Sequence, residues 1–177
     1  MSPKKTKRRR NSLRLKGFDY SSEGYYFVTI SCREKKTCFE NGKARKIVKR
    51  QIADLKNRFD ILIDCFTIMS DHIHIMIVLG KSKDASLSQV IQALKPSVTK
   101  KFREELGVLE KFWQRGFYDH IIRNERDYLE KKRYILNNPL KEELLGLRPH
   151  AENNKNHNRV GVELVSTPKQ VGINLSA

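Results

Sequence analysis

The residues best suited to chemistry in this chain are two histidines separated by a single isoleucine, His72 and His74. On a β-strand, residues two positions apart project from the same face, about 6.6 Å apart along the backbone. Two imidazoles in this arrangement can bind one metal ion. The same spacing also occurs for two unrelated histidines on a half-exposed strand, so the spacing by itself is only a weak indication of a metal site.

A second pair of functional side chains lies near the end of the last helical segment. Tyr134 and Asn138 are four residues apart, and therefore share one face of a helix. A phenol and an amide placed in this way could face the metal together with the histidines. Two structural alternatives remain: Asn138 precedes Pro139 and could simply end the helix, and Tyr134 could be a core aromatic residue.

The charge of the chain indicates a polyanionic partner. The 177 residues include 36 Lys and Arg against 20 Asp and Glu, a formal net charge of +16 that exceeds what solubility requires. Nucleic acid is favoured over an anionic membrane surface, because the sequence has no long basic helix with a bulky apolar face. Without an apolar run of about 18 residues or a secretory signal, we expect a cytoplasmic, nucleoid-associated protein.

The basic residues gather at the start of the chain. Eight of them fall within residues 1–16, which we interpret as a flexible arm that follows DNA phosphates; a solvated tail that only aids solubility is the alternative. The predicted DNA-binding residues are Lys4, Lys5, Lys7, Arg8, Arg9, Arg10, Arg14, Lys16, Arg115 and Arg123. The cysteines Cys32, Cys38 and Cys65 form no CxxC pair, so we expect them to be reduced and structural.

Hydrophobic periodicity predicts an α+β fold. The pattern predicts strands over residues 25–31, 61–69, 73–79 and 117–122, the second and third pairing as a hairpin, and helices over 44–59, 86–106 and 124–137. This order is that of the ferredoxin-like βαββαβ antiparallel sheet, with an additional C-terminal helix that carries Tyr134. The expected organisation is the arm, one domain over 17–147, and a loosely ordered tail over 148–177.

The sequence also makes predictions about two prolines in helices and about which side chains of the third strand share a face. We expect Pro96 to kink or split its helix and Pro139 to end the last helix. On the third strand, Ile73, Ile75 and Ile77 should face away from the histidines. We place Met76, Val78 and Leu79 on the histidine face.

Three segments together resemble the REP-associated tyrosine transposases, which belong to the IS200-like, single-tyrosine HUH superfamily. The segments are RLKGFDYSSEGYYFVTIS, SDHIHIMIVL and FWQRGFYDHIIRNERDYLEKKRYILNNPLK, within residues 12 to 145. The family's motif of histidine, bulky hydrophobe and histidine corresponds to His72, Ile73 and His74. Its nucleophile lies four residues before the asparagine of an Asn-Pro pair, which implies Tyr134, and Asn138 matches the third metal ligand.

Helix geometry agrees with this choice of tyrosine. Tyr128 is ten residues before Asn138 and would point well away from that face of a regular helix. The resemblance points away from Tyr118 as well. Among other polar residues, Asp71 and Asp119 are candidate carboxylates near the site. His120 matches a recurrent position of the family, but we leave it out of the metal set.

The resemblance implies a metal-dependent enzyme that cleaves and rejoins single-stranded DNA through a 5′-phosphotyrosine intermediate at hairpin-flanked repeats. It implies Mg²⁺ or Mn²⁺ as cofactor, single-stranded DNA with hairpin structure as partner, and a monomer or homodimer as the working form. A non-catalytic nucleic-acid-binding module derived from such a transposase is the main alternative. A hydrolytic metalloenzyme that does not use Tyr134 is a second.

An aromatic cluster beside basic residues could contact unpaired bases. Trp113, Phe117 and Tyr118 lie next to Lys111 and Arg115, a combination that suits single-stranded nucleic acid. The alternative, that Trp113 and Phe117 belong to the core, is at least as well supported by their composition.

Overall fold

The computed structural model describes residues 15, 17–82, 85–144 and 163–164, with side chains described up to Asn138. The predicted arm 1–16, apart from Leu15, and the predicted tail 148–177, apart from residues 163–164, lie outside the described residues. The expectations for these two segments, including Lys4, Lys5, Lys7, Arg8, Arg9, Arg10, Arg14 and Lys16 as DNA contacts, therefore stay predictions.

The described residues form an antiparallel sheet of five strands in the order β4-β1-β3-β2-β5. The strands are β1 (Gly24–Ser31), β2 (Ile61–Ile68), β3 (His72–Leu79), β4 (Tyr118–Ile121) and the two-residue β5 (Glu163–Leu164). β2 and β3 pair as the predicted hairpin. The order of the first four strands is the ferredoxin-like one, which confirms the predicted fold class.

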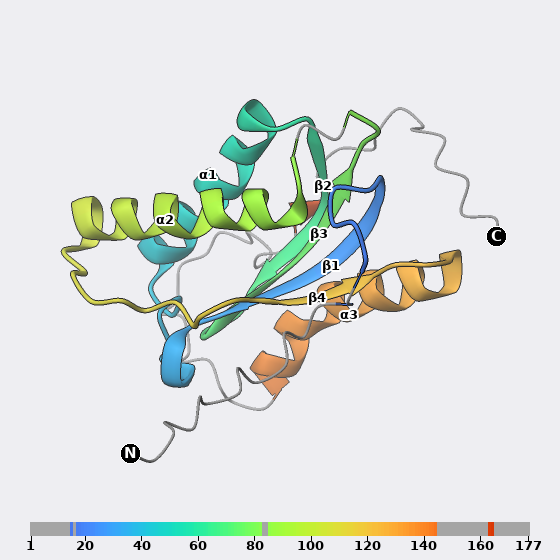
Figure 1. Cartoon of the computed structure of the whole chain (residues 1–177). Helices are drawn as coiled ribbons and strands as arrows, with labels where there is room; N and C mark the ends of the chain where they lie inside the picture. Colours follow the sequence, from blue (N-terminus) through green and yellow to red (C-terminus); the bar gives the residue numbers. More distant parts are fainter. Residues whose placement is uncertain (1–14, 16, 83–84, 145–162, 165–177) are drawn as a thin grey trace, which may run out of the picture.

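Helices cover both faces of the sheet (Figure 1). One face carries α1 (Gly42–Arg58) and α2 (Leu87–Leu106), and the other carries α3 (Glu125–Leu144). A short 3₁₀ turn, η1 (Arg33–Lys35), follows β1. Among the described residues, no helix combines the length and the apolar content that crossing a membrane requires.

Local sequence explains where α1 and α2 begin and end. The Asn41 side chain accepts a hydrogen bond from the Lys43 backbone at the start of α1. Ser86 and Gln89 form a reciprocal capping box at the start of α2. Gly107 ends α2 in the left-handed conformation, with φ of 67°, where a side chain would be strained.

The expected split of the helix at Pro96 and the expected helix end at Pro139 are both wrong. α2 is one helix through Pro96, and α3 passes through Pro139 and ends at Leu144. Each proline removes one backbone donor from its helix. Apolar faces that pack on the sheet offset this loss, because α2 buries Leu94 and Val98 on either side of Pro96.

Two cores of unequal size lie on the two faces of the sheet. The larger one, between the sheet and α1 and α2, contains the isoleucines of β3 and also Leu79. Our placement of Leu79 on the histidine face is therefore wrong, because strict alternation puts it with Ile73, Ile75 and Ile77. The smaller α3 cluster consists of Phe27, Cys65, Met76, Ile122 and Ile135.

A β-bulge in β2 helps to hold α3 on the sheet. The register with β3 shifts between Ile63 and Cys65, which leaves Asp64 and Cys65 on the same side of the strand. Asp64 accepts hydrogen bonds from the Tyr128 hydroxyl, at 3.1 Å, and from Lys132 Nζ, at 3.2 Å. Cys65 packs in the α3 cluster. The bulge thus supplies one polar and one apolar contact to the same helix.

The small size of the α3 cluster makes a prediction about stability. Ile135 is fully buried, whereas Leu129 on the same helix is 48% exposed. Ile135→Ala should lower the free energy of unfolding by about 2–4 kcal/mol, and Leu129→Ala by no more than about 0.5 kcal/mol. Urea unfolding followed by circular dichroism measures both, and equal losses would contradict the described docking of α3.

Candidate active site

The two histidines lie on the face of the sheet that α3 covers. His72 is the first residue of β3 and pairs with Ser31, while His74 pairs with Thr29 on one side and with Thr67 on the other. The His72 side chain is 27% exposed, and His74 is 4% exposed. Their Nε2 atoms are 3.0 Å apart. Both rings therefore direct the same nitrogen to one point.

Neighbouring oxygen atoms orient both rings. The Asp71 carboxylate lies 2.5 Å from Nδ1 of His72, and because a carboxylate only accepts, that nitrogen carries the proton. Nε2 of His72 then presents a lone pair. Thr29 Oγ1 lies 2.8 Å from Nδ1 of His74, and a threonine hydroxyl can accept from this nitrogen or donate to it. The short Nε2 distance therefore needs either a shared proton or a cation between the rings.

The donor set fits a divalent cation. Two adjacent ligands at right angles around a metal with bonds of about 2.1 Å lie about 3.0 Å apart, which is the separation of the two Nε2 atoms. Metal-binding histidines are usually held by an oxygen atom that contacts the ring nitrogen not bound to the metal. Asp71 and Thr29 contact the Nδ1 atoms here in this way. Burial, and then the neighbouring His72, lower the pKa of His74 to about 3, so its ring is neutral at pH 7 and able to bind a metal.

Tyr134 lies beside this pair, on α3 of the same chain. Its ring centroid is 5.1 Å from that of His74 and 5.9 Å from that of Phe27, both in edge-to-face geometry. Phe27 in turn stacks on His74. Tyr134 is 42% exposed, so a substrate can reach it. The structure thus brings together the predicted nucleophile and the histidine pair.

Tyr128 occupies a different environment. Its hydroxyl is bound between Asp64 and Lys132, and its ring packs against Tyr25. Burial raises its pKa, which makes the phenolate harder to form. These contacts hold α3 on the sheet and agree with the prediction of Tyr134 over Tyr128.

Asn138 is the third predicted ligand and lies one turn after Tyr134. It is 7% exposed, and its Nδ2 atom has no hydrogen-bond partner among the described residues. An unsatisfied buried polar atom is costly, and rotating the amide by 180° would place an oxygen, a good cation ligand, at the same position. The described residues contain no cluster of three or more His, Cys, Asp or Glu that could hold a metal, so an amide ligand would be needed here.

The two candidate carboxylates separate clearly. Asp71 contacts His72, as described above. Asp119 on β4 pairs with Val28, which belongs to the larger core, so Asp119 lies on the face away from the histidines. The sequence could not distinguish them, because the face of Asp119 depends on its pairing with a distant strand.

The sequence did not predict how several residues position α3. His120 Nε2 lies 2.9 Å from Asp127, which also accepts a hydrogen bond from the Arg123 backbone, and Asn124 caps the same turn. This cluster ties the start of α3 to β4. The spacing of Asn124 and Asp127 is typical of a helix start and could have indicated the cap. Nothing in the sequence indicated that His120 would contact Asp127.

The predicted aromatic and basic contacts have mixed placements. Trp113 and Phe117 pack against the larger core, whereas Tyr118 is 46% exposed. Tyr118 pairs with Thr29, so it belongs to the same cross-strand row as His74. Arg115 and Arg123 are exposed on either side of β4. Their role as DNA contacts stays a prediction.

Comparisons with known proteins identify the family of this chain. The sequence profile of the family described as "Transposase IS200 like" matches residues 20–138. An uncharacterized protein of Haemophilus influenzae is 30% identical over 74% of this chain and 88% of its own length. The REP-associated tyrosine transposase of Escherichia coli K12 is 25% identical, over 69% of this chain and 70% of its own length.

A solved structure shows the same fold. The structure of a REP-associated tyrosine transposase bound to a REP hairpin superposes with a TM-score of 0.58 at 20% identity, over 86% of this chain and all of the other. The resemblance found in the sequence is thereby confirmed. With a family profile that covers most of the described domain, this chain belongs to the IS200-like transposases, a family of DNA-processing enzymes.

Proposed function

We propose that this protein is a metal-dependent transposase that cleaves and rejoins single-stranded DNA through a 5′-phosphotyrosine intermediate, at repeats flanked by hairpins. The supporting observation is the position of Tyr134. Its ring centroid is 5.1 Å from that of His74, whose Nε2 atom lies 3.0 Å from Nε2 of His72. Family membership supplies the substrate class, and the hairpin in the related structure suggests its form.

Different residues of the chain have different roles in the proposed reaction. The Tyr134 phenolic oxygen attacks the scissile phosphorus and gives up its proton, while the 3′-oxygen leaves and takes up a proton. The DNA stays attached through its 5′ phosphate, so the energy of the broken bond is kept and a 3′-hydroxyl can reverse the step. His74 stays neutral, and Asp71 and Thr29 hold the two rings in place.

His72, His74 and Asn138 would hold a divalent cation, which when bound would supply positive charge to stabilise the phenolate and the charge on the scissile phosphate. A free tyrosine has a pKa near 10, so this charge matters at neutral pH. Mg²⁺ or Mn²⁺ is the expected ion. Two imidazoles are softer ligands than Mg²⁺ usually receives, and we expect Mn²⁺ to bind more tightly.

A covalent adduct tests the nucleophile. Wild-type protein incubated with Mn²⁺ and end-labelled single-stranded DNA from the region flanking its gene should give a shifted protein-DNA band on a denaturing gel. Tyr134→Phe should abolish the band, because a phenyl ring has no oxygen to attack phosphorus. Tyr128→Phe on the same helix should retain it.

The outcomes separate the candidate functions. An adduct that survives Tyr134→Phe and disappears in Tyr128→Phe would reject our assignment. Cleavage without any adduct would favour a hydrolytic metalloenzyme. Tight binding of hairpin DNA without cleavage or adduct, with every divalent ion tried, would favour the non-catalytic binding module.

Metal affinity tests the histidine pair independently of cleavage. Mn²⁺ titrated by calorimetry should bind the wild-type and Tyr134→Phe proteins alike, and His74→Ala should lose binding. Asp71→Asn should weaken binding about 10- to 100-fold, because the amide no longer fixes the His72 ring. Asp60→Asn, which changes an exposed carboxylate just before β2, is the matched control and should bind as the wild type does. Equal affinities of the Asp71 and Asp60 variants would exclude the role of Asp71.

A further inference from the structure

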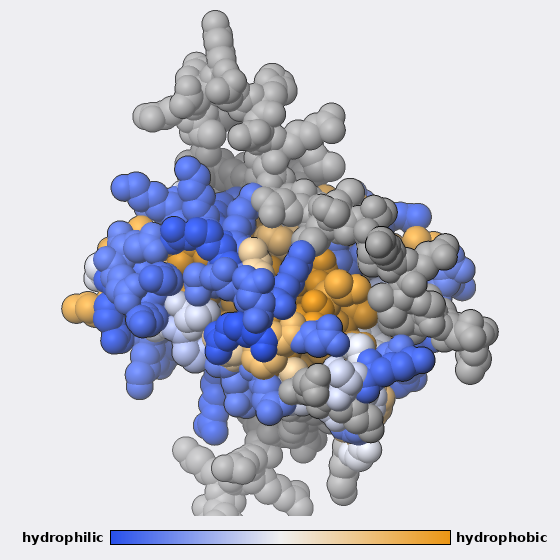
Figure 2. Space-filling view, turned by 90° about the horizontal axis from the view of Figure 1, so that it is seen from above, coloured by the Kyte–Doolittle hydropathy of each residue, from blue (hydrophilic) through white to orange (hydrophobic). Residues whose placement is uncertain are grey.

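The described helices divide the positive charge unequally between the two faces of the sheet. α1 contains seven Lys and Arg and one Asp, and α2 contains four Lys and Arg and two Glu. α3, on the side of the histidines, contains five basic and five acidic residues. Figure 2 looks down on the α1 and α2 side and shows hydrophilic side chains over much of the coloured surface. The helix layer with the positive charge is therefore the one opposite the candidate active site.

A pocket lies in this layer, between α2 and the segment that leads to β4. We call it the α2 pocket; it is lined by Lys95, Pro96, Thr99, Lys100, Arg103 and Trp113. Pro96, Lys100 and Arg103 are exposed at helical spacing along one stripe of α2. The pocket therefore combines an apolar wall, formed by Pro96 and Trp113, with a cationic rim.

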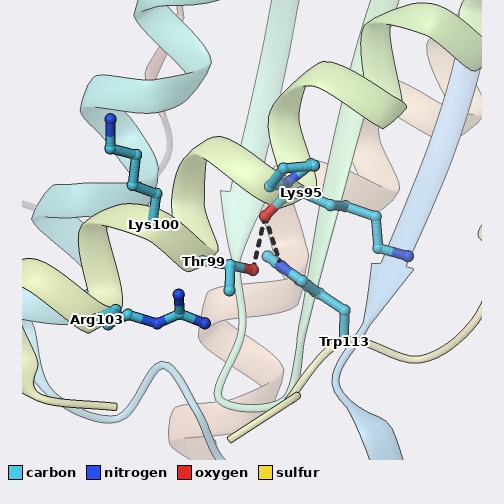
Figure 3. Close-up of a pocket in the computed structure, with 6 residues that line it drawn as sticks. Lys95, Thr99, Lys100, Arg103 and Trp113 are labelled. Atoms are coloured by element: carbon cyan, nitrogen blue, oxygen red, sulfur yellow. Dashed lines mark hydrogen bonds between the residues drawn. The ribbon is translucent and has the colours of Figure 1, made fainter. Parts of the chain in front are cut away.

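The apolar wall of the pocket is fixed in place. Trp113 Nε1 and Thr99 Oγ1 both donate to the Lys95 carbonyl oxygen, at 3.0 and 2.9 Å (Figure 3). The Lys95 amine extends away from Lys100 and Arg103 and donates to the carbonyl oxygens of Gln114 and Gly116. Lys95 thus anchors the segment after Trp113, and its charge is already engaged.

Two cations of the rim remain available to a ligand. Arg103 forms no ion pair within the described residues, and the contact between Lys100 and Glu104 is long, at 3.9 Å. Glu104 makes its closer contact, at 2.8 Å, with Lys101. Lys100 and Arg103 can therefore contact an anion without first breaking a strong pair.

A short stretch of chain links the pocket with the strand that borders the candidate active site. Only four residues separate Trp113 from Tyr118, which lies on the edge strand β4 in the same row as Thr29 and His74. Exposed Arg115 lies between them. A flexible polyanion at the histidines can pass Tyr118 and Arg115 around this edge of the sheet and reach the pocket.

We propose that the α2 pocket is a second binding site for the substrate DNA, occupied by a phosphodiester outside the cleaved segment. Lys100 and Arg103 contact the phosphate, and Pro96 and Trp113 contact the adjoining sugar or base. The identity of the polymer rests on the proposed function. DNA fits better than a membrane surface, because the rim surrounds a small recess and α2 keeps its apolar face in the core.

Trp113 gives a direct readout, because it is the one tryptophan of the chain. Full-length Tyr134→Phe protein is titrated, without divalent ions, with a labelled DNA stem-loop that carries a single-stranded 5′ extension. Label anisotropy measures affinity, and quenching of Trp113 emission by acrylamide, a neutral quencher, measures access to the pocket. Saturating DNA should reduce this quenching.

Paired variants measure the contribution of the rim. Lys100→Ala/Arg103→Ala should weaken DNA binding about 10-fold near 0.1 M salt and reduce the slope of log affinity against log salt by about 0.7–0.9, since the contacts with one phosphate are lost. Lys56→Ala/Lys81→Ala removes the same charge at exposed sites near the end of α1 and just after β3, at the other end of the sheet, and should have a much smaller effect. Thermal melts establish that both double variants are folded.

Three results would overturn the proposal: equal effects of the two double variants, unchanged Trp113 quenching at saturating DNA, or protection of Trp113 by phosphatidylglycerol vesicles and not by DNA. The stem-loop and the extension, titrated separately, identify which of them supplies the phosphate, and protection by neither also rejects the site. Because binding is measured without divalent ions, failure of the covalent-adduct experiment would leave this test valid.

Discussion

The docking of α3 on the open face of the sheet is the constraint on which the rest of the structure depends. The histidines belong to β3 and the tyrosine to α3, so their proximity exists only while the helix keeps its position. Five buried residues form the apolar part of this contact. Asp64 with Lys132 and Tyr128, and His120 with Asp127, form its polar part. Polar contacts are directional, and they fix the rotation of the helix more closely than the small cluster could alone.

The two faces of the sheet therefore contribute differently: one mainly stabilises the domain, and the other holds the candidate site. The large core under α1 and α2 contains most of the buried apolar residues, and its burial dominates the stability of the domain. The α3 side contributes less apolar burial and holds the buried polar groups of the candidate site, including His74, Thr67 and Asn138. Burying a polar group lowers the stability of the domain unless the group forms a hydrogen bond. The apolar burial in the larger core offsets this cost.

Local patterns were sufficient to predict β1 to β4, α1 to α3 and the paired functional residues. They did not predict η1, the short β5, or features that depend on distant partners. Alternation and helical spacing identified four strands and three helices, and the His72, His74, Tyr134 and Asn138 spacings marked the candidate site. The prolines were misjudged because packing on the sheet outweighs one lost hydrogen bond. Asp71 and Asp119 could not be separated, because the face of Asp119 follows from the pairing of β4 with the distant β1. The bulge at Asp64 could not be found, because it is a register shift between paired strands that hydrophobic alternation does not show.

Tyr134 and the histidine pair come from a single polypeptide in this structure. The chain thus acts as a tether that sets the local concentration of the phenol at the histidines.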